Sequence, residues 1–148
     1  TGGSVNFNTA GLQVFCHNAA VSDQSGEAAF VRVMNNRTGS HLQGMKSPYG
    51  PLQEIRVQTL DARTVLRDVE FAKIDAEGSE WAILSRLEGD TDFVTEITSP
   101  EIAAKVFDRF HDRFIYAQQR GWDRIFSADD MPVKHQDGAV YVRHAAWL

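Results

Sequence analysis

Three carboxylates lie close together between Lys73 and Glu80, and they are the clearest candidates for chemistry in the sequence. Asp75, Glu77 and Glu80 surround a glycine–serine pair directly after a short apolar run. Carboxylates at such a turn can accept a proton, orient a hydroxyl group or bind a cation. They can also act only as turn formers or as helix-start charges, which contribute a few tenths to about 1 kcal/mol. Without further context, the catalytic and the structural interpretations carry about equal weight.

Strands and helices are expected to alternate around this acidic turn. Residues 71–75 (FAKID) predict a strand that ends at the turn, and the spacing of Trp81, Leu84 and Leu87 predicts a helix after it. Residues 93–97 (FVTEI) predict the next strand. This alternation favours an α/β domain with a mostly parallel sheet and flanking helices, in which functional groups gather at the carboxyl ends of the strands.

A longer helix is predicted over residues 100–120. Ser99 and the proline after it are a good N-cap and N1 pair, and Gly121 is expected to end the helix. Its apolar stripe consists of Ile102, Val106, Phe110 and Phe114. Residues 122–126 and 139–143 predict two terminal strands that form an antiparallel pair.

The N-terminal third is expected to add further strands. Residues 12–16 (LQVFC) and 27–33 predict two strands that pair as a hairpin across a turn-rich cluster. Residues 35–51 predict a long loop, because glycines and prolines recur there without a sustained period. Residues 55–60 alternate apolar and polar side chains, which predicts a half-buried strand, and Asp61 then caps a short helical turn.

Composition excludes several classes of protein. The chain has 148 residues, of which 43% are hydrophobic, as expected for one globular domain. A formal charge of −5 gives no electrostatic reason to expect binding to nucleic acid or to an anionic membrane. Cys16 is the only cysteine, and neither a signal peptide nor an apolar run near the roughly 20 residues of a membrane span is found, so a cytoplasmic location is expected. No metal site is expected, because the histidines form no ligand cluster.

Residues 73–84 (KIDAEGSEWAIL) resemble the I-K-I-D-V-E-G-x-E-x-x-V-L signature of FkbM-family methyltransferases. Further segments resemble that family in the same order along the chain: NAAVSDQSGEAAF from Asn18, TGSHL from Thr38, VQTLD from Val57, VTEI from Val94 and GW at Gly121. The resemblance covers most of residues 14–126. It implies a class I, Rossmann-like domain that binds S-adenosylmethionine and methylates a hydroxyl of a small molecule or sugar.

The same resemblance assigns roles to individual residues. Asp75 or Glu77, with Glu96 on the neighbouring strand, would orient or deprotonate the acceptor hydroxyl. An unperturbed carboxylate is a weak base for an alcohol, so burial or a metal ion would have to assist it. The cofactor edge would consist of Asn18, Ala20 and Asp23, which follow the strand beside the adenine.

The glycine loop of the family, of the D-x-G-A-N-x-G type, has no counterpart here, because Gly2 and Gly3 do not lie between a strand and a helix. The sequence is therefore expected to match the C-terminal part of the family domain, either as a fragment or as a degenerate homologue. An open sheet edge would then favour a homo-oligomer. Two alternatives remain: an inactive structural or interaction domain, and a carboxylate–metal hydrolase that uses Asp75, Glu77 and Glu80.

Overall fold

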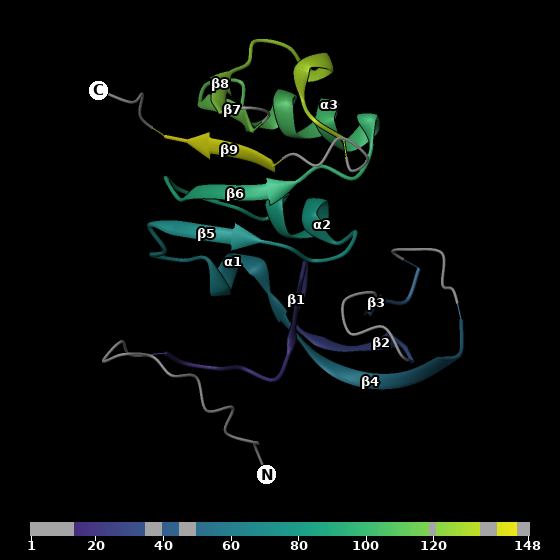
Figure 1. Cartoon of the computed structure of the whole chain (residues 1–148). Coiled ribbons are helices and arrows are strands. Elements are labelled where there is room, and N and C mark those ends of the chain that lie inside the picture. The colour runs from purple at the N-terminus through teal and green to yellow at the C-terminus, as the bar shows by residue number, and fades with distance from the viewer. Residues whose placement is uncertain (1–13, 35–39, 45–49, 119–120, 134–138, 145–148) are drawn as a thin grey trace.

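The computed structural model describes residues 14–34, 40–44, 50–118, 121–133 and 139–144, and these form a mixed α/β structure with two sheets (Figure 1). None of the helices in these residues combines the length and the apolar character that a bilayer span requires.

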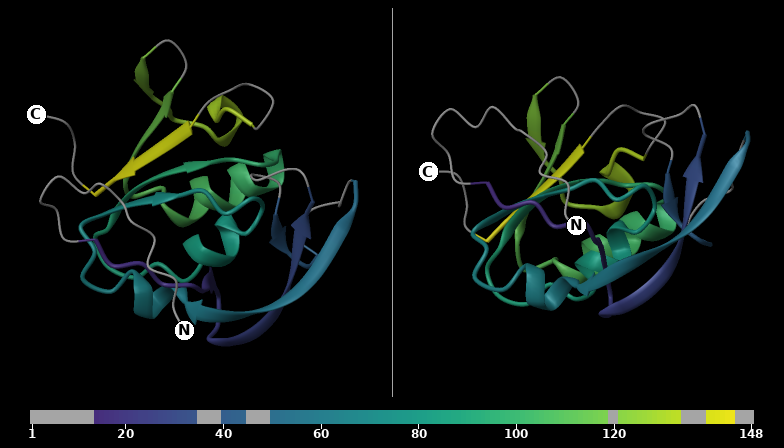
Figure 2. Two further views of the ribbon diagram at one scale, coloured as in Figure 1. Left: turned by 60° about the horizontal axis from the view of Figure 1, so that its bottom comes forward. Right: turned by 90° about the horizontal axis from the view of Figure 1, so that it is seen from below.

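The first sheet has the strand order β1-β4-β2-β3. Its strands are β1 (Ala20–Ser22), β2 (Gly26–Val33), β3 (His41–Leu42) and β4 (Leu52–Asp61). β2 and β4 pair antiparallel along the whole of β2, and β1 pairs parallel with the last residues of β4. The result is a long curved ribbon that extends away from the second sheet (Figure 2). The predictions of strands at residues 27–33 and 55–60 are therefore confirmed.

The predicted hairpin between residues 12–16 and 27–33 is wrong. Residues 14–16 form no strand and are exposed, with Val14 at 52% and Phe15 at 82% exposure, while residues 12 and 13 lie outside the described part. β2 pairs instead with β4 and β3, which come later in the chain. A short apolar run carries no information about its partner, and here the neighbouring segment supplies the strand β1.

The long loop predicted over residues 35–51 is described only at residues 40–44 and 50–51. Within it, His41 and Leu42 form β3, which pairs with β2 at Val31 and Phe30. The pairing explains why these two loop residues are buried. A loop segment thus becomes part of the first sheet.

The second sheet has the strand order β5-β6-β9-β7-β8 (Figure 1). Its strands are β5 (Phe71–Ile74), β6 (Asp92–Glu96), β7 (Phe114–Gln118), β8 (Trp122–Arg124) and β9 (Ala139–Arg143). Only β5 and β6 pair parallel, and the other neighbours in this sheet pair antiparallel. The expected mostly parallel sheet is therefore a mixed one, while the predicted strands at residues 71–75 and 93–97 are confirmed to within one residue.

The terminal strands are present, but they do not pair with each other. β8 pairs with β7, whereas β9 lies between β6 and β7, where Val142 is the partner of both Phe93 and Ile115. Val140 and Val142 are completely buried at that position. Burial of the apolar face of β9 between two strands explains why it does not lie at an edge beside β8.

Within the described residues, three short α-helices accompany the sheets: α1 (Ala62–Val65), α2 (Glu80–Leu84) and α3 (Pro100–Arg109). A 3-10 turn, η1 (Ala128–Asp130), follows β8. α2 and α3 lie against one face of the second sheet (Figure 2). Buried residues of these helices and of the second sheet form one core cluster, which includes Phe93, Phe110, Leu84, Ile97 and Val106.

The helix predicted over residues 100–120 ends at Arg109. Its start is as expected, because the Ser99 hydroxyl accepts a hydrogen bond from the backbone N–H of Ile102 at 3.2 Å. Phe110 closes the helix and is buried, but Phe114 begins β7.

Contacts outside the helix explain its early end. The guanidinium of Arg113, just before β7, donates hydrogen bonds to the backbone carbonyls of Thr91, at 2.9 Å, and Gly89. These contacts tie the turn after α3 to the loop before β6. The apolar residues that follow alternate in burial along β7, so they serve the sheet and not a helix.

Candidate functional site

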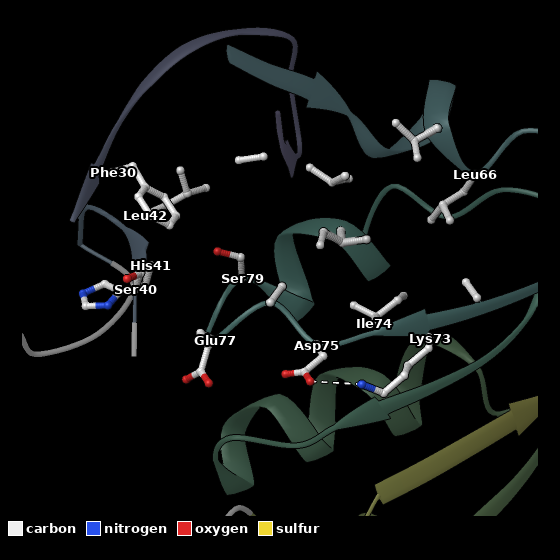
Figure 3. A pocket seen from close by; sticks show the side chains of 16 residues that line it. Phe30, Ser40, His41, Leu42, Leu66, Lys73, Ile74, Asp75, Glu77 and Ser79 are labelled. Atoms are coloured by element: carbon white, nitrogen blue, oxygen red, sulfur yellow. Dashed lines mark hydrogen bonds and ion pairs between the residues drawn. The ribbon is translucent and has the colours of Figure 1, made fainter. Parts of the chain in front are cut away.

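A pocket of about 390 Å³ lies between the first sheet and the carboxyl end of β5 (Figure 3). We call it the central pocket. Its apolar lining consists of Ala20, Val21, Phe30, Leu42, Val65, Leu66, Ala72, Ile74, Ala76 and Ile83. Its polar lining consists of Ser40, His41, Lys73, Asp75, Glu77 and Ser79. An apolar pocket with a few convergent polar groups is the usual form of a small-molecule site.

The acidic turn forms the polar rim of the central pocket. The backbone N–H of Ser79 donates to the carbonyl of Ala76 at 3.1 Å, which closes a tight turn between β5 and α2. Glu77 and Gly78 both have positive φ, at 48° and 105°. Positive φ at both central residues is the type I′ pattern, which glycine adopts freely and which strains a glutamate. Glu77 is therefore held in a strained conformation at the pocket, as functional residues often are.

Glu80 holds this turn in place through hydrogen bonds to the backbone of the turn. Its side chain is 2% exposed, and its carboxylate accepts hydrogen bonds from the backbone N–H of Ala76, at 3.1 Å, and of Gly78, at 2.9 Å. Charge-assisted bonds of this kind are stronger than neutral ones. The structural interpretation therefore applies to Glu80, whose carboxylate is bonded to the backbone of the turn and does not line the central pocket. The described residues contain no group of three or more His, Cys, Asp or Glu that could hold a metal ion.

Asp75 and Glu77 both line the central pocket (Figure 3). Asp75 Oδ2 lies 3.1 Å from Lys73 Nζ, and both side chains are at least half exposed. An ion pair so open to solvent contributes little to stability, so Asp75 stays accessible to a ligand. Glu77 is half-buried. The structure thus brings two of the predicted carboxylates to one pocket.

Glu96 lies near them but outside the lining of the central pocket. Ile74 and Thr95 are partners in the parallel β5–β6 pair, and Glu96 is the next residue of β6. Its side chain is exposed. Glu96 therefore sits at the expected strand end without facing the pocket that Asp75 and Glu77 share.

The three residues expected at the cofactor edge do not all meet at the central pocket. Ala20 lines the central pocket, whereas the exposed Asn18 shares with Ala20 a different hollow of about 490 Å³ beside β2 and β4. Asp23 is also exposed, and its Oδ1 accepts a hydrogen bond from the Ser22 hydroxyl at 3.1 Å. Ala20 is thus the only member of this set at the central pocket.

Asp61 anchors the side of the pocket that α1 forms. Its carboxylate accepts hydrogen bonds from the backbone N–H of Arg63, at 2.8 Å, and from Arg86 at 3.2 Å. The Arg63 N–H, and secondarily the Arg86 guanidinium, lower the pKa of the Asp61 carboxyl below its usual value of 3.8. The cap and the ion pair hold α1, whose last residue, Val65, lines the pocket together with Leu66, the next residue of the chain.

Two buried polar residues of the pocket were not predicted as site residues. Ser79 and His41 are each 2% exposed and line the central pocket. Ser79 lies inside the signature segment and close to Glu77, so the sequence could have indicated Ser79 as a site residue. His41 lies inside the TGSHL segment that resembles the family, but its burial depends on the pairing of β3 with β2, which local patterns do not reveal.

Comparison with known families gives a match that covers most of the chain. The family model of the methyltransferase FkbM domain matches residues 4–132. No curated protein and no solved structure matches the chain. The matched residues include every residue that lines the central pocket.

Proposed function

The chain belongs to the methyltransferase FkbM domain family, and from that premise we propose that it is an S-adenosylmethionine-dependent methyltransferase that methylates a hydroxyl of a small molecule. The observation that supports this proposal is the central pocket, where Asp75 and Glu77 meet an apolar lining at the carboxyl end of β5. Functional groups gather at such strand ends in Rossmann-like folds. Because both sheets line this pocket, we take the 148 residues as one methyltransferase-like domain.

The residues that line the central pocket fit the sulfonium end of S-adenosylmethionine, the cofactor that the family implies. When bound, S-adenosylmethionine supplies a methyl group on a positively charged sulfur, and two carboxylates beside an apolar lining suit such a charge. Ala20 and Glu77 are the residues that would contact it from the central pocket. The adenosine end has weaker support, since Asn18 and Asp23 lie away from this pocket.

The acceptor hydroxyl has to be oriented and has to lose its proton. Glu77 is the better placed base, because the turn braced by Glu80 holds it at the pocket and removes most of its freedom to move. Asp75 already shares its carboxylate with Lys73, which suits it for orienting the acceptor. In this assignment the proton moves from the acceptor oxygen to a carboxylate oxygen of Glu77.

Conservative substitutions of both carboxylates test the assignment. Asp75→Asn and Glu77→Gln keep the side-chain shape and remove the charge, and loss of the base should lower turnover by about 10²- to 10⁴-fold. The measurement is transfer of tritiated methyl from S-adenosylmethionine to a panel of defined alcohols and sugars. The control is Glu101→Gln, which changes an exposed carboxylate on α3 that pairs with Lys105, and it should turn over like the parent. Parental turnover of both single variants and of the double variant would exclude this role for the acidic turn.

A second candidate is a methyltransferase-like binding domain without catalysis. The position of Asn18 and Asp23 outside the central pocket favours it, because these residues were expected at the cofactor. Titration calorimetry with S-adenosylmethionine separates the two candidates. Micromolar binding favours the enzyme, whereas absence of binding together with absence of methyl transfer favours the binding domain.

A further inference from the structure

The hydroxyl of Ser79 is buried without a hydrogen-bond partner in the part of the chain that the structure describes. Buried polar side chains nearly always have a partner, because loss of water without replacement is unfavourable. Ser79 also lines the central pocket, and Figure 3 shows its hydroxyl pointing away from α2 toward the wall that carries Phe30 and Leu42. The missing partner is therefore to be sought in the pocket.

The local structure explains why Ser79 does not use its hydroxyl within the protein. A serine at a helix N-cap normally accepts a bond from the backbone two or three residues later, in an extended conformation. Ser79 has φ −93° and ψ 6°, and its side chain makes no such bond. The nearby N–H groups of Ala76 and Gly78 already donate to Glu80. These bonds hold the turn before α2, and the Ser79 hydroxyl is left to the pocket.

The opposite wall of the pocket is apolar and comes from the first sheet. Phe30 and Leu42 are paired across β2 and β3, so their side chains lie on the same face of the first sheet. Both line the central pocket together with Val21, and Ile83 of α2 adds apolar surface on the other side. A ligand held here meets hydrogen-bonding groups at the turn and hydrocarbon along the wall.

We propose that Ser79 is a positioning residue whose hydroxyl binds the hydroxyl of the methyl acceptor beside Glu77, and that the acceptor is an alcohol or phenol with an apolar body. This inference rests on the proposed function. Phe30 and Leu42 would pack against the apolar body. A polyhydroxylated sugar fits poorly, because several of its hydroxyls would be buried against this wall without partners.

Small probes test this site without the cofactor. Phenol and toluene have nearly the same shape and differ in the hydroxyl, and methyl α-D-glucopyranoside represents a sugar. Each is titrated into the full 148-residue chain, and binding is followed through the backbone amide signals of Phe30, Leu42 and Ser79 in two-dimensional NMR. We expect phenol to shift these signals at lower concentration than the glucoside.

The substitution Ser79→Ala separates the hydroxyl contact from packing. Loss of one hydrogen bond should weaken phenol binding about 3- to 10-fold and leave toluene binding within about twofold. Ser85→Ala is the matched control, because Ser85 lies just after α2 and its hydroxyl donates to the Ala82 carbonyl at 3.1 Å, outside the pocket. Ser85→Ala should change neither affinity. Ser79→Ala should not lower the melting temperature, since its hydroxyl has no partner to lose among the described residues.

Three results would overturn the proposal: glucoside binding as tight as that of phenol, equal effects of Ser79→Ala on phenol and toluene, or no phenol binding at these residues. None of the measurements contains S-adenosylmethionine. Phenol binding with the expected Ser79 dependence, combined with no methyl transfer, would therefore contradict the proposed function and leave the binding site intact.

Discussion

The two sheets of this protein are stabilised in different ways. In the second sheet the inward residues are packed under α2 and α3, and Phe93, Val140 and Val142 are completely buried. In the first sheet β4 is exposed along most of its length, and Ile55 keeps 37% of its surface in solvent. Buried apolar area is the main source of folding free energy, so the second sheet should dominate stability. The first sheet contributes mainly a wall of the pocket.

This difference matters for the site that the sheets share. The acidic turn follows β5 of the well-packed sheet and is braced by Glu80, so its carboxylates sit on a firm support. Phe30 and Leu42 belong to the more exposed sheet, where local opening costs less free energy. The candidate catalytic carboxylates thus lie at the end of a strand in the well-packed sheet, and the apolar wall of the pocket belongs to the more exposed sheet.

The largest expected effect compares a residue of the main core, packed on the second sheet, with a residue of the first sheet. Phe110 is 3% exposed, and its ring packs edge-on against Phe93 with centroids 5.0 Å apart. Phe110→Ala should lower the free energy of unfolding by about 3–5 kcal/mol, because it leaves a cavity in the main core. Ile55→Ala in β4 should cost about 1 kcal/mol or less, since Ile55 is partly solvated already. Urea denaturation followed by circular dichroism measures both, and equal costs would contradict the contrast between the sheets.

A smaller effect is expected at the turn that joins β5 to α2. Glu80→Gln removes the charge that strengthens the bonds from Ala76 and Gly78, and it should cost about 1.5–3 kcal/mol of unfolding free energy. Glu101→Gln is the control, because Glu101 is an exposed helix residue, and its substitution should change stability little. Denaturation midpoints of the two variants provide the comparison. An unchanged midpoint for Glu80→Gln would mean that the brace does not hold the turn.

The smallest expected effect on stability concerns the contact between Asp61 of the first sheet and Arg86, which follows α2. Asp61 ends β4, and its carboxylate contacts Arg86, which follows α2. The Arg63 backbone N–H and, secondarily, Arg86 lower the pKa of the Asp61 carboxyl, so these contacts favour the folded state above the usual value of 3.8, and the benefit disappears as the pH falls through the lowered value. Stability of the parent should therefore decrease below pH 3.8. In Asp61→Asn this decrease should be smaller, as measured by thermal melting at a series of acidic pH values.

Glu101, a second carboxyl with a lowered pKa, serves as the control for the effect of Asp61 on stability at acidic pH. The pKa of the Glu101 carboxyl is also lowered, mainly by the hydrogen bond from Lys105. Glu101→Gln removes a pair confined to one helix, so it should leave the contribution of Asp61 in place. If both variants showed the same acid profile as the parent, neither contact would contribute to the pH dependence of stability.

Local patterns in the sequence determined much of the fold. Strands β2, β4, β5 and β6 were predicted from apolar runs, and the caps at Asp61 and Ser99 from their side chains. The acidic turn was predicted as the junction between a strand and a helix, and the signature around it indicated the family that the domain match supports. These features depend on residues only a few positions apart, so a linear pattern contains them.

Long-range packing decided the rest. The repeat from Ile102 to Phe114 fits a helix, and the alternation of burial in β7 emerges only when Ile115 and Ala117 pair with β9. The insertion of β9 between β6 and β7 likewise depends on which strand buries Val140 and Val142 best. Such pairings join residues far apart in the chain, and no local propensity specifies them.

Part of the candidate site was likewise determined by local sequence, and part was decided by the tertiary structure. The sequence alone determined that carboxylates follow β5, because the turn, the glycine and the brace by Glu80 lie within one short segment. Only the tertiary structure decided that Asp75 and Glu77 share a pocket with Leu42 and that Glu96 lies outside it. A pocket exists where separate elements fail to fill the space between them, and that depends on how two sheets pack, which no single segment encodes.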